Sequence, residues 1–258
     1  VEKGTKEGWI DVYENQGKTS GAYSFGSYDS KPYILLNYTN TLKDVFTIVH
    51  EMGHSMHSFY TRKTQPFTYG DHSIFTAEVA STVNESLLMQ HLLQKETDPE
   101  MRKYLVNYYI EEFRTTLFRQ TMFAEFEMLT HKEVENGGVL TAEWLCEVYD
   151  KLNKDYFGPA LAEDEYIKYE WARIPHFYRS FYVYQYATGY SAATAISKRI
   201  LTEGEKARTD YIEFLKSGSS DYPVELLKIA GVDMSSPAPI RAAMETFQSL
   251  VEELETLL

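Results

Sequence analysis

The chain has 258 residues, of which 43% are hydrophobic, so it can form a packed core and is not a disordered protein. Its 25 Lys and Arg against 38 Asp and Glu give a net charge of −13, which disfavours nucleic acids and anionic membranes, since both would be repelled at long range. No stretch approaches the roughly 20 apolar residues of a membrane-spanning helix, and residues 1–8 lack the apolar segment of a signal peptide. We therefore expect no nucleic-acid partner and no membrane association.

Cysteine use bounds the compartment. The single cysteine, Cys146, cannot form an internal disulfide, so we expect a cytoplasmic protein. The chain starts at Val1 without a methionine, and we expect it to be one piece of a longer protein.

The predicted elements change character after the first forty residues. Glycines and alternating aromatics predict two short strands, over 21–27 and 32–37, joined by a turn. Helical patterns with caps and breakers then predict helices over 41–60, 73–94, 99–135, 141–157, 163–172, 175–203, 205–216, 222–230 and 237–257. The expected fold is mostly helical with a small N-terminal β element, and no linker divides residues 1–258.

The most informative segment lies on the first long helix. His50 and His54 are four residues apart, so a helix places both imidazoles on one face, where they can share a zinc ion with Glu51 beside them as general base. The alternative is a pair of ordinary histidines. A chance His-Glu-x-x-His is expected in only about one per cent of chains of this size, which gives the motif weight without deciding the question. The helical wheel favours the metal, since it places these histidines and His57 opposite an apolar stripe, which contains Ile48, Met52, Met56 and Phe59.

A catalytic zinc needs a third protein ligand and an open position. His57 lies about 10.5 Å along the helix from His50, too far to share one ion, but it remains a candidate for the outer shell of the site. The next helix carries Glu78, and its small neighbours Ala77, Ala80 and Ser81 allow a close approach to the histidines. Glu85 follows two turns later, where it can accept the second ring N–H of a ligand histidine. The alternative for both carboxylates is a solvated helix face.

These motifs resemble a known family. The segments His50-Glu-x-Gly-His-x-x-His57, Glu78-Val-Ala-Ser-Thr and Pro32-Tyr-Ile-Leu-Leu-Asn are similar to the thimet oligopeptidase and oligoendopeptidase F family of zinc metallopeptidases, and the similarity continues to Tyr184-Gln-Tyr-Ala-Thr-Gly189. The resemblance implies a zincin-like catalytic domain that holds one Zn²⁺ per chain, with His50, His54 and Glu78 as ligands and Glu51 as base. Members of the family also have a helical N-terminal half that walls a deep channel, so we expect that half to be missing here.

A second segment predicts chemistry of its own. Tyr178, Tyr182, Tyr186 and Tyr190 recur every four residues, which predicts a ladder of phenols along one helix. A phenol or imidazole aimed at the scissile carbonyl oxygen stabilises the charge that develops there, although an aromatic core stripe is the alternative. The resemblance implies that His176 and tyrosines of this segment polarise that carbonyl, with Tyr186 ranked first, then Tyr190 and Tyr182.

The expected function is a zinc endopeptidase that cuts short, unstructured oligopeptides. One alternative is a zinc-holding structural or partner-binding module that is inactive without its missing half. Another is an exopeptidase, for which we find no charge trap that would bind a free peptide terminus. The strand over 21–27 either offers an open edge to an extended peptide or is a plain hairpin strand. His72 is expected to be a loop residue.

Overall fold

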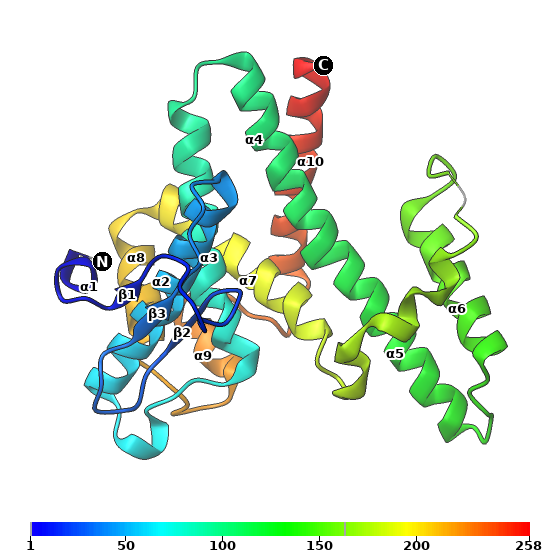
Figure 1. The fold of residues 1–258 in the computed structure, drawn as a ribbon, viewed down its shortest axis with the longest axis horizontal. Helices are drawn as coiled ribbons and strands as arrows, with labels where there is room; N and C mark the ends of the chain where they lie inside the picture. Colours follow the sequence, from blue (N-terminus) through cyan, green and yellow to red (C-terminus); the bar gives the residue numbers. More distant parts are fainter. Residues whose placement is uncertain (1, 163) are drawn as a thin grey trace. The chain divides into compact units, whose positions relative to one another are not determined.

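The computed structural model describes residues 2–162 and 164–258, so Val1 and Glu163 lie outside the described residues. The fold is mostly helical with a small sheet near the N-terminus, which confirms the predicted fold class (Figure 1). The chain divides into two compact units: Val1–Tyr109 with Gly189–Leu258, and Ile110–Thr188. No helix within the described ranges is long and apolar enough to cross a membrane. That residues 1–258 work as a single catalytic domain stays a prediction.

The first unit holds the sheet and most of the helices. Its elements are α1 (Glu2–Lys6), β1 (Ile10–Asp11), β2 (Tyr23–Phe25), β3 (Tyr33–Leu35), α2 (Leu42–Thr64), a 3-10 turn (Phe67–Tyr69), α3 (Ile74–Lys95), most of α4 (Pro99–Glu112), most of α7 (Tyr184–Glu203), α8 (Glu205–Leu215), α9 (Pro223–Ile229) and α10 (Ala238–Leu257).

The sheet has the strand order β1-β3-β2. Strands β2 and β3 form the predicted antiparallel pair, with Ser24 opposite Ile34. Strand β1 pairs in parallel with the other side of β3, and the sequence did not predict it because two residues are too short to show an alternating pattern. Strand β2 therefore lies at one edge of the sheet, with one side unpaired among the described residues.

Helix α2 starts at a capping box and packs its apolar stripe on the sheet. The Thr41 side chain accepts from the Asp44 N–H, and the Asp44 carboxylate accepts from the Thr41 N–H. Met52, Ile48 and Met56 pack against Ile34 and Leu36 of the sheet. The strands run beside α2 in Figure 1, as this packing requires.

Helices α2 and α3 approach each other closely at Gly53. A Cβ atom on Gly53 would lie 2.5 Å from the Ser81 Cα and 2.6 Å from the Ala80 carbonyl oxygen, both of which are backbone atoms that cannot swing aside. The absence of a side chain at this position allows α3 to lie against the histidine-bearing helix. The small residues that the sequence singled out on α3 are thus at the contact.

We expect Gly53→Ala to destabilise the protein by about 1 to 3 kcal/mol, because the added methyl group overpacks a backbone contact. Moving α3 away from α2 also withdraws Glu78 from His50 and His54, so affinity for the predicted zinc ion should fall as well. Urea unfolding measures the first effect and zinc titration the second.

Gly189→Ala provides a matched control, since Gly189 is also a buried helical glycine. A Cβ atom there meets only the Glu78 Cβ, at an ordinary 3.9 Å. Replacing a helical glycine with alanine at a position with space should leave stability unchanged or raise it by up to about 1 kcal/mol. Equal unfolding midpoints for Gly53→Ala and the unsubstituted protein would contradict the close approach.

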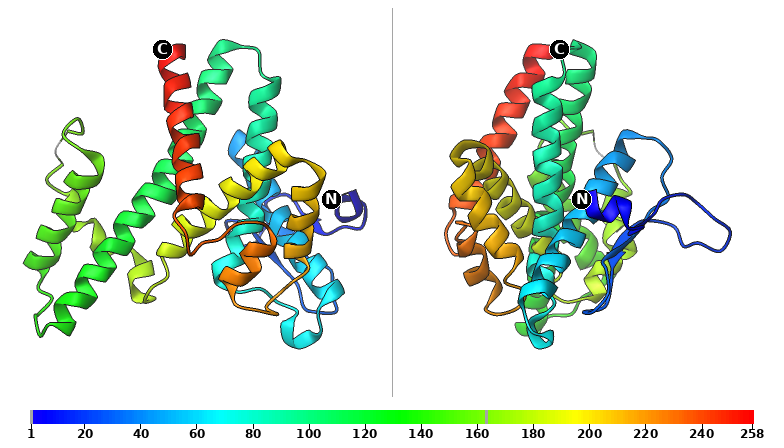
Figure 2. Two further views of the ribbon diagram at one scale, coloured as in Figure 1. Left: turned by 180° about the vertical axis from the view of Figure 1, so that it is seen from behind. Right: turned by 90° about the vertical axis from the view of Figure 1, so that its left-hand side faces the viewer.

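The main core of this unit lies on the far side of α3. It is built by α3, α7, α8 and α9, whose contributions include Val79, Val83, Ala192, Ile196, Phe214 and Leu227. Helix α10 lies beside α4 in Figures 1 and 2, where Arg102 donates to the Glu253 carboxylate at 2.6 Å. Helix α2, which carries His50 and His54, therefore packs against α3, and α3 in turn packs against α7, α8 and α9.

The second unit consists of helices and turns around its own core. It contains a π-helical segment (Phe113–Phe118), α5 (Arg119–Glu135), α6 (Ala142–Phe157) and 3-10 turns at Ile167–Arg173 and Pro175–Tyr178. Met122, Phe123, Phe126 and Tyr149 fill its core. The π segment interrupts the helix predicted over 99–135, and 3-10 turns replace most of the helix predicted over 163–172, whose first residue is not described.

The single helix predicted over 175–203 is wrong in its first part, because α7 begins only at Tyr184. Phe181 adopts a left-handed backbone conformation, with φ of 57°, and its N–H donates to the buried Glu127 carboxylate at 2.6 Å. This tertiary contact holds Phe181 in a non-helical conformation, so the helix can begin only after it. The tyrosine ladder is accordingly broken, since Tyr178 and Tyr182 precede α7 and only Tyr186 and Tyr190 lie on it.

Candidate metal centre

Helix α2 brings two imidazoles to one point. The Nε2 atoms of His50 and His54 lie 3.1 Å apart, with the ring planes at 80° to each other. The spacing of four residues produces this arrangement, because residues one helical turn apart lie on the same face.

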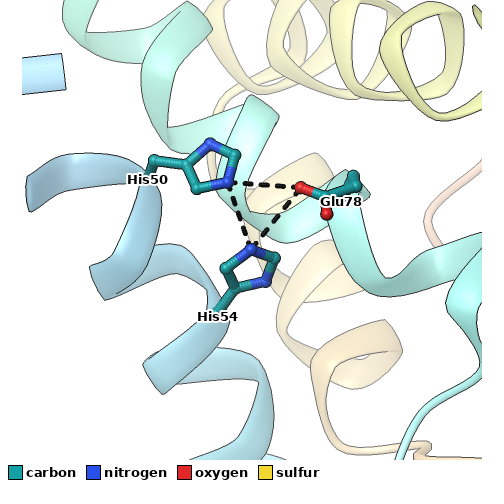
Figure 3. Close-up of side chains that lie close together, drawn as sticks. All are labelled: His50, His54 and Glu78. Atoms are coloured by element: carbon teal, nitrogen blue, oxygen red, sulfur yellow. Dashed lines mark hydrogen bonds and ion pairs between the residues drawn. The ribbon is translucent and has the colours of Figure 1, made fainter. Parts of the chain in front are cut away.

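Glu78 of α3 completes the cluster that the sequence predicts. Its Oε2 atom lies 3.2 Å from the His50 Nε2 and 3.5 Å from the His54 Nε2, as Figure 3 shows. A tetrahedral zinc with bonds of about 2.0 to 2.1 Å requires its ligand atoms to lie about 3.4 Å apart. The three observed separations match that requirement, and these residues are the metal-type cluster found in the described part of the chain. The donor set and its spacing therefore fit a zinc ion.

Glu85 lies where an outer-shell carboxylate would act. Its Oε1 atom is 3.2 Å from the His50 Nδ1, on the side of the ring that faces away from Glu78. Such a contact keeps the proton on Nδ1 and leaves Nε2 free to bind a metal. The structure thus brings Glu85 to the predicted position.

Hydrogen bonds and opposite charges hold His50, His54 and Glu78 together. Burial by itself would lower the pKa of His50, but the hydrogen bonds and charges of Glu78 and Glu85 outweigh it and raise that pKa to about 10. Burial would likewise raise the pKa of Glu78, yet its contacts with His50 and His54 hold it below its ordinary value. Glu78 therefore stays ionised beside the two imidazoles, where its negative charge favours a bound cation.

Glu51 sits beside the cluster without joining it. Glu51 is 6% exposed and lines two cavities, one that it shares with His50 and His54 and a second that it shares with His50 and Glu85. Burial raises the pKa of Glu51, although the nearby charges of His50 and His54 oppose the rise. A carboxylate with a raised pKa is suited to accept and return a proton.

A cavity of about 680 Å³ lies next to the candidate ligands. The edge strand β2 and residues 26–28 form one wall, and the face of α2 with His50 and His54 forms another. The Ser24 and Ser55 hydroxyls are 2.8 Å apart, which ties the strand to the helix. The ligand atoms therefore face open space that a substrate can enter.

The helical wheel predicted that His57 lies away from the apolar core, and this prediction is wrong. It is fully buried, and its ring stacks on that of His72 at 4.0 Å and packs against Phe214 of α8. Neither of its ring nitrogens has a hydrogen-bond partner among the described residues, so it makes no contact with a candidate ligand like that between Glu85 and His50. Helix α8 covers the C-terminal half of α2, as the hydrogen bond from the Thr61 hydroxyl to the Leu215 carbonyl shows, and a wheel drawn for one helix cannot include that neighbour.

Sequence reasoning missed two residues that share the histidine face. Ser58 and Arg62 line the same cavity as His50 and His54. The signal was present, because all four positions recur at intervals of four residues along α2. His72, expected to be a loop residue, also lines this cavity and is largely buried.

The tyrosine candidates fall in different units. In the second unit the Tyr186 hydroxyl lies 3.3 Å from the His176 Nε2 and 3.5 Å from the Tyr182 hydroxyl, and the His176 ring stacks on Tyr182. The structure thus gathers three predicted residues, although not on one helix. Tyr190 belongs to the first unit, where it is buried on α7 next to Gly189, the residue that approaches Glu78.

The sequence pattern of peptidase family M3 matches residues 1–246. The chain belongs to peptidase family M3. Among the curated relatives of this M3 chain, "Oligopeptidase PepF" of Bacillus subtilis (strain 168) is 56% identical over all of the chain and 38% of its own length. The "Oligoendopeptidase F homolog" of Lactococcus lactis subsp. lactis is 50% identical over all of the chain and 43% of its own length. The predicted family resemblance is confirmed.

Two solved structures of peptidases share the fold of this chain. The crystal structure of oligoendopeptidase-F from Enterococcus faecium has a TM-score of 0.76 at 51% identity, and covers 84% of this chain and 39% of its own. The crystal structure titled "putative peptidase from Chlamydophila abortus" has a TM-score of 0.92 at 47% identity. The match covers all of this chain and 43% of that one. The M3 chain spans about two fifths of the length of the curated relatives it matches, between 38% and 43% for those two.

Proposed function

We propose that this chain carries the catalytic centre of a zinc-dependent endopeptidase that hydrolyses short, unstructured peptides. The observation that carries the proposal is the spacing of the His50, His54 and Glu78 ligand atoms, between 3.1 and 3.5 Å, beside an open cavity. Membership of family M3 supports it. We further propose that this centre is part of a longer, cytoplasmic protein.

The residues of the chain divide the work as follows. His50, His54 and Glu78 would hold one zinc ion, and Glu85 would orient the His50 ring. When bound, zinc lowers the pKa of a coordinated water and polarises the scissile carbonyl. Glu51 accepts the proton of the attacking water and returns it to the leaving amine nitrogen. The burial of Glu51 supports this role, because a buried carboxylate binds a proton more readily than an exposed one.

We assign the stabilisation of the carbonyl oxygen to His176 and a tyrosine, with Tyr186 first, then Tyr190 and Tyr182. The contact between the Tyr186 hydroxyl and the His176 Nε2 supports this order, because a phenol that is held by an imidazole has a fixed direction. Donors that are oriented before the reaction stabilise developing charge without reorganisation.

The unpaired edge of β2 is the proposed binding surface for the peptide backbone. Residues of β2 line the cavity with His50 and His54, and the strand is at the edge of the described sheet. Main-chain pairing with such an edge does not depend on side chains, which suits an enzyme that accepts many sequences.

A quenched fluorescent peptide assay with metal analysis tests the proposal. We expect one zinc per chain, cleavage within the peptide, loss of cleavage on chelation and recovery with added zinc. Blocking both peptide ends should leave cleavage intact, whereas a requirement for a free end would indicate an exopeptidase. Stoichiometric zinc without turnover would support the alternative, a zinc-holding or partner-binding module.

Glu85→Gln tests the outer-shell contact. Replacing the carboxylate removes the negative charge at the His50 Nδ1 but keeps a possible acceptor, so we expect zinc affinity to fall by roughly 10-fold, and by up to about 100-fold in Glu85→Ala. Competition with a fluorescent chelator measures it. Unchanged affinity in both variants would show that the contact does not support the ligand.

A further inference from the structure

Arg62 lies on the metal-site face of α2, at the end of the cavity away from His50. His50, His54, Ser58 and Arg62 recur every four residues and all line this cavity. Arg62 is the one Lys or Arg among the described residues that do so. Arg62 therefore places a permanent positive charge in the cavity, about two to three helical turns along α2 from the histidines, although the net charge of the chain is −13.

The guanidinium of Arg62 has no carboxylate partner in the described part of the chain. The Arg62 side chain is half-buried and lines the cavity, where an arriving molecule can reach it. Its Nη1 atom has no hydrogen-bond acceptor among the described residues and lies 3.1 Å from where a Cβ atom on Gly26, the residue after β2, would be. A charged donor left without an acceptor lacks the stabilisation that a carboxylate provides, often through two parallel hydrogen bonds. The site is therefore suited to an arriving carboxylate.

The acidic residues around the cavity do not fill this position. Glu78 is engaged by the two ligand histidines, and Glu51 lies at the metal end. Asp71 also lines the cavity, but its side chain is 83% exposed, and its nearest ionisable contact is His72 at 3.7 Å. No carboxylate of the described residues therefore pairs with Arg62, and a peptide that enters the cavity can supply one.

The distance to the metal centre sets the position of that carboxylate on a bound peptide. Arg62 follows His54 by eight residues and His50 by twelve, which corresponds to about 12 to 18 Å along the helix. An extended peptide advances about 3.3 Å per residue, so Arg62 lies about four to five residues from the bond at the metal.

The direction of strand β2 indicates whether the peptide residue near Arg62 lies before or after the scissile bond. Strand β2 runs in the same sense as α2, since Ser24 contacts Ser55 and, further along both elements, Gly26 lies near Arg62. Antiparallel pairing is the more stable arrangement, and a peptide paired in this way runs from Arg62 toward the ligands. Residues before the scissile bond would then lie near Arg62.

We propose that Arg62 binds a carboxylate of the peptide substrate about four to five residues from the scissile bond. The inference rests on the proposed peptidase function. The strand direction favours an acidic side chain on the N-terminal side of the bond. A C-terminal carboxylate of the peptide, which requires the opposite direction, has the same chemistry.

Matched peptides and variants test the inference. The first peptide set is blocked at both ends and carries one Glu, or one Gln, at each of the third to sixth positions before the scissile bond. The second set carries a free C-terminal carboxylate or an amide at the matching distances after it. Zinc-loaded protein is compared with Arg62→Gln, Arg62→Glu and the control Lys63→Gln, which removes the adjacent, exposed charge outside the cavity. The readouts are kcat/KM, and peptide Kd in a Glu51→Gln background, with zinc content and circular dichroism to verify folding.

We expect Glu to be preferred over Gln by about tenfold at the fourth or fifth position. That ratio should fall to about one in Arg62→Gln, invert in Arg62→Glu and persist in Lys63→Gln. The same pattern in the acid and amide set would also support Arg62 and identify the terminal carboxylate as its ligand. Ratios that do not respond to Arg62 in either set would overturn the inference alone, whereas a protein that neither binds nor cleaves any peptide would remove the proposed function, and this inference with it.

Discussion

Replacing Glu51 with Gln should reduce kcat for peptide cleavage by roughly 10² to 10⁴-fold. Glutamine has nearly the same shape as the buried carboxylate but cannot accept the proton of the attacking water. Glu51 is not one of the three residues whose ligand atoms form the candidate metal site. Zinc content and peptide affinity should therefore stay close to those of the unsubstituted protein. Stopped-time cleavage assays, zinc analysis and fluorescence anisotropy with an uncleaved peptide measure the three quantities.

Glu51→Asp is the matched control for this experiment. It keeps the carboxylate and withdraws it by one methylene group, so we expect an activity between those of the two other proteins. If Glu51→Gln retained full turnover, another group would have to accept the proton, and the assignment of Glu51 as base would be wrong.

Glu78→Ala should lose zinc. The substitution removes one of three protein ligands and leaves only the two imidazoles of α2, so the loss of affinity should exceed the roughly 10 to 100-fold typical of an outer-shell substitution. The metal content of protein purified at limiting zinc, and competition with a chelator of known affinity, measure it. Peptide cleavage should disappear in parallel and return partly at high zinc concentration.

Asp71→Asn is the comparison that separates ligand loss from a general change in charge. Asp71 lines the same cavity but is largely exposed and lies outside the metal-type cluster. Its substitution should leave zinc stoichiometric. Retention of one zinc per chain in Glu78→Ala would exclude Glu78 as the third ligand.

Local sequence patterns were sufficient where one element contains the whole signal. The four-residue spacing of His50 and His54 places both rings on one helical face, and the alternating aromatics before residue 40 predict the β2 and β3 pair. Glu78 required one more step, which the small residues Ala80 and Ser81 supplied by indicating a close helix contact. That contact exists at Gly53, where the two backbones meet.

Tertiary packing decided the remainder, because the groups responsible come from distant parts of the chain. The burial of His57 depends on Phe214, and the late start of α7, at Tyr184, depends on a hydrogen bond from the Phe181 N–H to the Glu127 carboxylate. Arg62 shares the histidine face in the sequence, but only the fold shows that it lines the cavity without a carboxylate partner among the described residues. Helical periodicity specifies direction around one axis, whereas burial and pairing depend on which neighbours fill the space beside it.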